Sequence, residues 1–241
     1  MKLIKLNAID STNEYIKKIK SSVPDNLFCL YTFNQTNGKG QRGSIWESEP
    51  NKNICISLCY KPLISEPNYT NFKINMLVSN ILVEFFKDLK IPRIKVKWPN
   101  DILSDNKKIS GILIETSLKA NKVCDYIIGI GININQENFN HLVNANSIKN
   151  ISGVDYDLNI LTTRLINFFH DLDYRFNQNS IDDIKSKYIN NLYGHNSLIK
   201  FTSDKNEFEG KIIDIISENK IKLRVNEKEI VFKGGDLKLI Y

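Results

Sequence analysis

Four short segments of the sequence combine glycines with side chains that can bind anions or polar ligands. The first runs from Gln35 to Trp46, with glycines at 38, 40 and 43 and the cations Lys39 and Arg42. The Gly-x-Gly-x-x-Gly spacing is typical of a dinucleotide-binding turn, but that turn must open a helix at its last glycine. Residues 44–50 lead into another strand-like run instead, so this interpretation fails. What remains is a plain surface loop, or a flexible loop whose N–H groups and cations can lie against an anion.

The second segment, Lys97–Ile102, ends a strand with Trp-Pro-Asn-Asp. Pro99 and Asn100 are typical turn residues, so one interpretation is purely structural. In the other interpretation, Asp101 holds Mg²⁺ or orients a cation, and Asn100 contacts a nucleotide. The segment on its own leaves both open.

The third segment is Lys107–Glu115. In a regular strand, Lys108 and Ser110 share one face and Gly111 lies on the other. A glycine inside a strand suggests the close approach of a ligand or of another backbone. A lysine at a strand edge is usually solvated, so a catalytic role for Lys108 needs support from elsewhere in the sequence.

The fourth segment, Ile127–Asn135, is a β-branched strand interrupted by Gly129 and Gly131. Glycines weaken a strand, so something must need the space that they leave. Asn133 follows at the end of the strand and is suited to hold a nucleotide or a metal-bound water. A structural bulge is the competing explanation for the glycines.

The elements that must position these segments follow from apolar periodicity and turn residues. Helical spacing over Asn71–Leu89 predicts a long helix, and Ser11 with Glu14 three residues later predicts a capping box opening a helix that ends near Lys20. Further helices are expected at Leu158–Phe176 and Ile181–Leu192. Strands are expected at Lys2–Leu6, Leu27–Phe33, Ile54–Tyr60, Ile94–Trp98, Ile109–Thr116 and Tyr126–Ile132, with turns at 104–106 and 120–122 and a loop over 34–50. Because strands and helices do not alternate regularly, we expect an α+β fold with a mixed or mainly antiparallel sheet and flanking helices.

The pattern changes after residue 193. Short strand-like runs follow at Ser197–Phe201, Phe208–Ser217, Lys220–Val225, Glu229–Phe232 and Leu237–Ile240. Such closely spaced short strands are typical of a small β-barrel. We therefore expect two domains, residues 1–193 and residues 194–241.

Composition narrows the class of protein. With 41% hydrophobic and 25% charged residues, the chain of 241 residues is not a disordered one. It has no apolar run long enough to span a membrane and no signal-peptide core at its start, so we expect a cytoplasmic protein.

The net charge of +6 rests on 28 lysines and only five arginines. Because arginine is the usual reader of base edges, a solvated lysine-rich surface is favoured over nucleic-acid binding. The four cysteines lack a Cys-x-x-Cys pair and are expected to be buried thiols rather than zinc ligands or disulfides.

Taken in this order, the four segments resemble the biotin–protein ligase family, of the type without an N-terminal helix-turn-helix. The resemblance spans Leu6 to about Asn133 and extends to Gly234-Gly235-Asp236, which is similar to the closing motif of the family. It implies a fold related to class II aminoacyl-tRNA synthetases with a small SH3-like C-terminal barrel. It also implies that biotin and ATP form biotinyl-5′-AMP with Mg²⁺, and that biotin then passes to a lysine of a biotin carboxyl carrier domain of acetyl-CoA carboxylase or a related carboxylase. No prosthetic group, DNA or membrane partner is implied, and a homodimer is one expectation.

The resemblance also implies roles for individual residues. Lys108 matches a lysine that contacts the biotin carboxyl group and the phosphate, and Arg42 and Asp101 join it as candidate catalytic residues. Candidate biotin-binding residues are Ser11, Thr12, Asn13, Gln35, Gly38, Lys39, Gly40, Gln41, Lys108, Gly111 and Gly129. Candidate nucleotide-binding residues are Lys39, Gln41, Arg42, Trp46, Lys97, Asn100, Lys108 and Asn133, with Trp46 beside the adenine. Asp101 and Asn133 are the candidate metal ligands.

The sequence departs from the family pattern in one place and leaves two alternatives. The family loop commonly reads Gly-Arg-Gly-Arg, where this chain has Gly38-Lys39-Gly40-Gln41. Gln41 cannot supply the charge of an arginine, so faster loss of the adenylate is expected unless Arg42 or Lys39 substitutes. The alternatives are a lipoate–protein ligase of the same fold and, more remotely, a basic nucleic-acid-binding protein.

Overall fold

The computed structural model describes residues 1–62, 71–119, 122–139, 142–203, 206–217 and 219–240. Within this part of the chain, seven strands form one sheet, in the order β1-β2-β5-β9-β8-β7-β6. The sheet is mixed, because β1 runs parallel to β2 while each of the other neighbouring pairs is antiparallel. The strands are β1 (Lys2–Leu6), β2 (Leu27–Thr32), β5 (Ile54–Tyr60), β6 (Ile94–Lys97), β7 (Asp101–Ser104), β8 (Lys107–Lys119) and β9 (Lys122–Ile132). The expected mixed sheet is confirmed.

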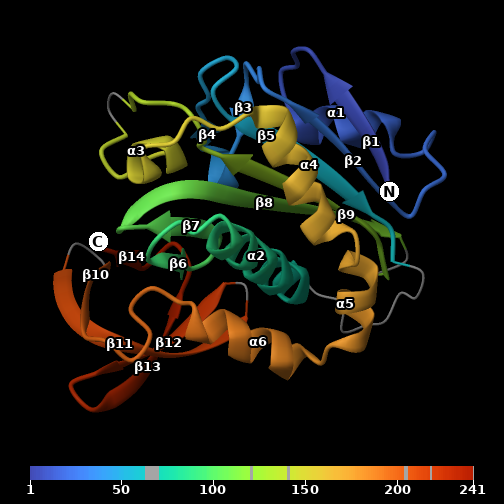
Figure 1. Cartoon of the computed structure of the whole chain (residues 1–241). Helices are drawn as coiled ribbons and strands as arrows, with labels where there is room; N and C mark the ends of the chain where they lie inside the picture. The colour runs from blue at the N-terminus through green and yellow to red at the C-terminus, as the bar shows by residue number, and fades with distance from the viewer. Residues whose placement is uncertain (63–70, 120–121, 140–141, 204–205, 218, 241) are drawn as a thin grey trace.

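Helices cover both faces of this sheet (Figure 1). On one face lies α2 (Asn71–Asp88), whose apolar residues at helical spacing are almost all buried. It packs against α4 (Leu158–Phe169), α5 (Leu172–Gln178) and α6 (Ile181–Asn190). On the other face, α1 (Thr12–Ile19) buries Ile16 in a smaller cluster with residues of β2, β5 and β9. The sheet is therefore the middle layer, with α2 and the helices that pack against it on one face and α1 on the other.

A second sheet is formed by the C-terminal residues. In the described part of the chain it contains five antiparallel strands in the order β13-β12-β11-β10-β14. They are β10 (Ile199–Ser203), β11 (Asn206–Ser217), β12 (Lys220–Val225), β13 (Lys228–Lys233) and β14 (Lys238–Leu239). Their buried apolar residues continue the core of the larger sheet rather than forming a separate one. The division at residue 193 stays a prediction.

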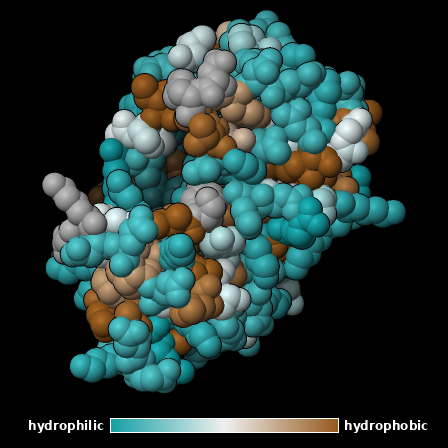
Figure 2. Space-filling model, turned by 90° about the vertical axis from the view of Figure 1, so that its left-hand side faces the viewer, coloured by the Kyte–Doolittle hydropathy of each residue, from teal (hydrophilic) through white to brown (hydrophobic). Residues whose placement is uncertain are grey.

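The face of the molecule on the left-hand side of Figure 1 is mainly hydrophilic (Figure 2). Apolar residues gather on this face in separate patches, in both the upper and the lower part of the view. No helix in the described part of the chain is both long and apolar enough to cross a lipid bilayer.

Several element boundaries differ from the sequence-based expectations. β7 was not expected, because it is only four residues long and directly follows the turn residues Pro99 and Asn100. The helix expected over Leu158–Phe176 is two helices, α4 and α5, which are separated at residues 170–171. The polar stretch 34–50 contains a short hairpin, β3 (Gly38–Lys39) with β4 (Ile45–Trp46), on either side of a 3₁₀ turn. α3 (Ile148–Ser152) was also not expected. The turn expected at 120–122 lies mostly outside the described residues.

Three of the four cysteines are buried, as expected, and Cys124 is exposed, which corrects the expectation for that residue. Burial raises the pKa of the Cys29 thiol to about 12, that of Cys55 to about 12 and that of Cys59 to about 11. These thiols therefore stay protonated at neutral pH and behave as small apolar side chains.

Candidate active site

A cavity of about 200 Å³ lies where the start of α1, the glycine loop 38–46 and the central strands β5, β8 and β9 meet. It contains most of the residues that the sequence singled out. From that set its lining includes Ser11, Thr12, Asn13, Gln35, Lys39, Gly40, Gln41, Trp46, Asn100, Asp101, Lys108, Gly111 and Gly129. The candidate residues come from five segments of the chain, and the fold brings them to one place.

The polar end of the cavity is built on the first turn of α1. Ser11 is the N-cap and accepts a hydrogen bond from the backbone N–H of Glu14 at 3.4 Å, as the capping pattern predicts. Thr12 donates to Gln35 Oε1 from its backbone N at 2.9 Å and from its hydroxyl at 3.1 Å. Gln35 is thereby fixed by the helix start, so capping and a place in the cavity wall coexist here.

Asn13 is held on both sides by residues that the sequence did not single out. Ser57 Oγ of β5 donates to Asn13 Oδ1 at 2.6 Å, and Asn13 Nδ2 donates to Glu115 Oε2 of β8 at 2.9 Å. A Cβ atom on Gly129 would lie 2.9 Å from Asn13 Cγ, so the glycine provides the space for this amide. Ser57 and Glu115 sit in ordinary strand patterns, and only the three-dimensional structure shows that they orient Asn13.

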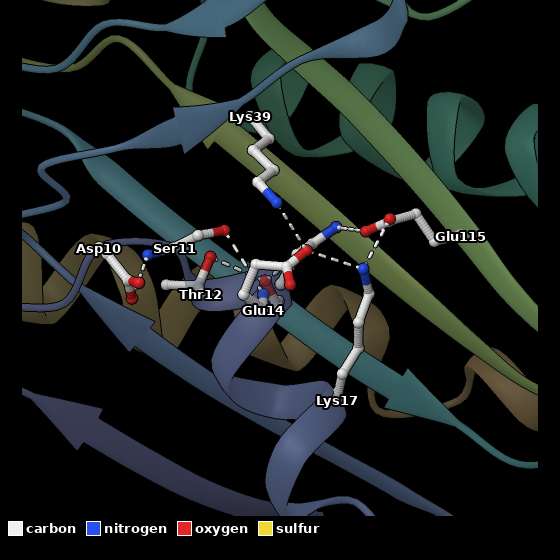
Figure 3. Close-up of polar contacts among 9 residues, drawn as sticks. Asp10, Ser11, Thr12, Glu14, Lys17, Lys39 and Glu115 are labelled. Atoms are coloured by element: carbon white, nitrogen blue, oxygen red, sulfur yellow. Dashed lines mark hydrogen bonds and ion pairs between the residues drawn. The ribbon is translucent and has the colours of Figure 1, made fainter. Parts of the chain in front are cut away.

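Ion pairs connect the first turns of α1 with the glycine loop and with β8 (Figure 3). Glu14 forms ion pairs with Lys17 at 2.9 Å and with Lys39 at 3.1 Å, while Lys17 also reaches Glu115 at 2.7 Å. Hydrogen bonds from Lys17 and Lys39 lower the pKa of Glu14. Lys39 therefore points back to α1 in this structure, and the chain of charges links the loop to the groups that hold Asn13.

Lys108 lies on the opposite wall, and its direction corrects the expectation for this strand. A bulge shifts the register between β7 and β8, so Ile102 pairs with Ser110 but Leu103 pairs with Lys108. The extra residue reverses the alternation: Lys108 Nζ lies 3.2 Å from the position of a Cβ atom on Gly111, on the cavity side. Lys108 and Gly111 therefore share a face, where a regular strand separates them.

Asp101 holds the ammonium group of Lys108. Asp101 Oδ1 lies 2.7 Å from Lys108 Nζ, and Asp101 Oδ2 lies 3.4 Å from Lys97 Nζ. The turn before Asp101 is fixed from behind, because Asn75 of α2 and Tyr188 of α6 both donate to the carbonyl oxygen of Pro99, at 2.8 and 3.1 Å. Of the two functions considered for Asp101, the arrangement shows the orientation of a cation, and the binding of Mg²⁺ stays a prediction.

Trp46 fills the space that the strand glycines leave. A Cβ atom on Gly111 would lie 3.0 Å from Trp46 Cζ3, and one on Gly131 would overlap the indole ring. The ring thus lies so close to the sheet that both positions require glycine, and Lys108 Nζ lies 5.4 Å from the ring centroid. The close approach expected at these glycines is that of a side chain, not of another backbone.

A second cavity of about 320 Å³ adjoins the first and shares Ile45, Trp46 and Lys108 with it. Its further lining residues are Glu47, Asn133, Phe139, Leu142, Val143, Asn144 and Ala145. This wall is largely apolar, and Val143 is 74% exposed, so a ligand can cover apolar surface there. Of the candidate residues from the sequence, Trp46, Lys108 and Asn133 line this second cavity, and Asn133 Nδ2 donates to the carbonyl oxygen of Asn146 at 3.0 Å.

Three candidate residues do not line either cavity. Arg42 points away and donates to the carbonyl oxygen of Gly234 in the C-terminal sheet, so this structure does not place its charge at the reacting groups. Lys97 Nζ lies 3.4 Å from Asp101 Oδ2, and Asp101 itself lines the first cavity. Gly38 lies in the β3–β4 hairpin, paired with Trp46.

No preformed metal cage exists among the described residues, where no three His, Cys, Asp or Glu side chains are grouped to hold a metal ion. The first cavity nevertheless presents the Asp101 carboxylate beside Lys108. Mg²⁺ is commonly held by one or two carboxylates together with the phosphates of a nucleotide, and Asp101 fits that pattern.

Comparison with known proteins agrees with this geometry. The model of the biotin/lipoate A/B protein ligase family matches residues 6–133, more than half of the chain. The bifunctional ligase/repressor BirA of Escherichia coli (strain K12) is 28% identical over 163 residues, which cover 67% of this chain and 50% of that protein. The BirA protein of Bacillus subtilis (strain 168) is 30% identical over 135 residues, 56% of this chain and 41% of that protein. The chain thus spans about half the length of the curated relatives that it matches.

Solved structures show the same fold over nearly the whole chain. Biotin protein ligase from Aquifex aeolicus in complex with biotin and ATP has a TM-score of 0.79 at 24% identity, covering 99% of this chain and 98% of that one. Biotin protein ligase from Leishmania major in complex with biotinyl-5-AMP has a TM-score of 0.64 at 18% identity, covering 96% and 98%. Both sheets and their helices are therefore common to these proteins.

Proposed function

Because this chain belongs to the biotin/lipoate A/B protein ligase family, we propose that it is an ATP-dependent biotin–protein ligase. It activates biotin as biotinyl-5′-AMP and then transfers biotin to a lysine of a biotin carboxyl carrier domain. The observation that carries this proposal is the pair of adjoining cavities, one mainly polar and one mainly apolar, with Lys108 at their common boundary. Two substrates can lie end to end there, with their reacting groups at Lys108.

The polar cavity suits the ureido ring of biotin. Its inner end offers the buried side chains of Ser11, Thr12, Asn13 and Gln35, all of which are less than 10% exposed. Hydrogen-bonding groups in an enclosed site discriminate strongly against ligands that cannot pair with them. Since Ser57 and Glu115 fix the Asn13 amide, its orientation is set before the ligand arrives.

The apolar cavity suits the adenine of ATP, with the Trp46 ring as one wall. The carboxylate of biotin and the α-phosphate of ATP then meet beside Lys108. A carboxylate oxygen attacks the α-phosphorus, the bond to the bridging oxygen breaks, and pyrophosphate leaves. Two anions approach each other in this step, so the Lys108 ammonium group stabilises the charge that accumulates between them.

Asp101 positions Lys108 for this step and, with Asn133, would hold Mg²⁺ bound to the nucleotide. That ion supplies positive charge to the leaving phosphates. In the second step, the amine of the carrier lysine attacks the acyl carbon of the mixed anhydride, an amide forms and AMP leaves. The carrier must approach from the open side of the first cavity, past the glycine loop.

Pyrophosphate exchange tests the assignment and separates it from the lipoate alternative. The protein is incubated with ATP, Mg²⁺ and labelled pyrophosphate, with biotin or with lipoate. We expect label to enter ATP with biotin and not with lipoate, and a purified carrier domain to gain the mass of one biotinyl group. Exchange supported by lipoate alone identifies a lipoate–protein ligase, and exchange with neither refutes the proposal. Tight binding to duplex DNA at physiological salt would support the nucleic-acid alternative instead.

A further inference from the structure

The tip of the glycine loop is bonded to the C-terminal sheet through one side chain. Arg42 Nη2 donates to the carbonyl oxygen of Gly234 and lies 3.4 Å from Asn219 Oδ1. Asn219 precedes β12 and Gly234 follows β13, and the backbone N of Gly234 donates to the carbonyl oxygen of Asn219 at 2.9 Å. The guanidinium group therefore contacts two turns of the C-terminal sheet that are already joined to each other.

The contact requires the two glycines at positions 234 and 235. A Cβ atom on Gly235 would lie 2.7 Å from Arg42 Nη1, and Gly235 has φ +116°, which favours glycine. A Cβ atom on Gly234 would lie 2.8 Å from Trp98 Cη2. The Gly234-Gly235 turn thus touches both the glycine loop and the strand end that leads to Asp101.

The backbone of Arg42 also indicates that its side chain is held. Its φ of 55° and ψ of 35° lie in the left-handed region, which is unfavourable for a residue with a side chain. Such a conformation persists where surrounding contacts fix it. Gln41 and Ser44, on either side of this turn, line the first cavity, and Gly40 N donates to Ser44 O at 2.8 Å. The position of Arg42 therefore determines where the cavity-lining part of the loop lies.

We propose that Arg42 is a positioning residue and that the Gly234-Gly235 turn is its seat, through which the C-terminal sheet fixes the glycine loop over the cavity. A charged residue at position 41 would fix the loop through a contact with the ligand. In this chain, part of that fixation comes instead from the intramolecular contact between Arg42 and the seat. We expect a fixed loop to retain biotinyl-AMP in the cavity, and this part of the proposal rests on the proposed function. The contact between the seat and the loop does not depend on the proposed function.

Hydrogen exchange of the ligand-free protein tests the link without reference to activity. Amide exchange over residues 38–46 is compared among the wild type, Arg42→Ala, Gly235→Ala and the double variant. Loss of a charge-assisted hydrogen bond should speed exchange by about tenfold in each single variant. The double variant should exchange no faster than the singles, because both break one contact. Unchanged exchange in Arg42→Ala, or additive effects in the double variant, overturns the proposal.

Gly153→Ala is the matched control. Gly153 caps α3 with φ +74°, and a Cβ atom there would meet nothing within 4 Å. This variant also places alanine at a position with positive φ, but it does not touch Arg42. Exchange over residues 38–46 should match the wild type, and an increase as large as that of Gly235→Ala would show that general destabilisation, not the seat, controls the loop.

Retention of the intermediate is measured second. Biotinyl-AMP is formed in the active site, and its dissociation rate is followed after dilution. We expect biotinyl-AMP to dissociate about tenfold faster from Arg42→Ala than from the wild type. An unchanged dissociation rate in the presence of faster loop exchange refutes the role in retention. If the wild type forms no biotinyl-AMP, the proposed function fails, while the exchange result still decides whether Arg42 fixes the loop.

Discussion

Replacing Gly129 by alanine tests whether the Asn13 amide is set by its surroundings. The added methyl group would lie 2.9 Å from both Asn13 Cγ and Asn13 Nδ2. Strand backbone accepts alanine readily, so the perturbation is purely one of space. The amide must move, and it then loses the hydrogen bonds from Ser57 at 2.6 Å and to Glu115 at 2.9 Å.

The size of the effect follows from these contacts. Overpacking a closed site by one methyl group costs about 1–3 kcal/mol of unfolding free energy. For a chain of this size, a loss of about 2 kcal/mol lowers Tm by about 4–8 °C. A displaced amide also loses one or two hydrogen bonds to biotin at about 1 kcal/mol each, which weakens biotin binding by about 5–30-fold.

Calorimetric titration with biotin and a thermal unfolding scan measure the two effects. Asn13→Ala is the matched background, because it removes the amide that the methyl group would strike. In that background, Gly129→Ala should cost little further stability and little further biotin affinity. Pyrophosphate release at saturating biotin should stay within about threefold of wild type, since Lys108 lies on the opposite wall.

Two results would refute this reasoning. If Gly129→Ala lowers Tm by the same amount with and without the Asn13 side chain, the obstruction is not Asn13. If it binds biotin as tightly as the wild type, the orientation of Asn13 does not contribute to the site.

Three further outcomes are expected. Lys108→Ala should slow adenylate formation by about 10²–10³-fold, because the charge between carboxylate and phosphate loses its partner, and near-normal pyrophosphate release would contradict this role. Gln41→Arg should slow the dissociation of biotinyl-AMP, whereas equal rates for variant and wild type would show that position 41 does not hold the intermediate. Iodoacetamide at pH 8 should label Cys124 first in the native protein, because burial keeps the other three thiols protonated. Mass spectrometry of the labelled protein before and after unfolding in urea checks this order. Rapid labelling of the buried cysteines in the native protein would contradict it.

The sequence predicted those parts of the structure that depend on local patterns. The apolar stripe of α2, the Ser11 cap and the two glycine-bearing strands β8 and β9 are all properties of neighbouring residues, and each is present. The same holds for most cavity residues, because their motifs resemble those of a known family.

The rest depended on contacts between distant segments. Lys108 faces the cavity because of a bulge against β7, a strand too short to be expected. Ser57 and Glu115 carry no local signal, and they matter only because β5 and β8 lie on either side of β9 in the sheet. Arg42 is drawn to a carbonyl group almost at the other end of the chain. In each case the deciding partner is one that a linear pattern does not contain.

The position of the aromatic residues has a practical consequence. The chain has two tryptophans, one in the wall of the cavities and one behind them at the C-terminal sheet. Trp46 is a wall of both cavities, while Trp98 is 4% exposed and packs against the Gly234-Gly235 turn. The tryptophan fluorescence of the unlabelled protein therefore arises from these two places alone. With Trp98→Phe the emission reports the filling of the cavities, and with Trp46→Phe it reports the junction with the C-terminal sheet, so the protein carries its own optical probe of each.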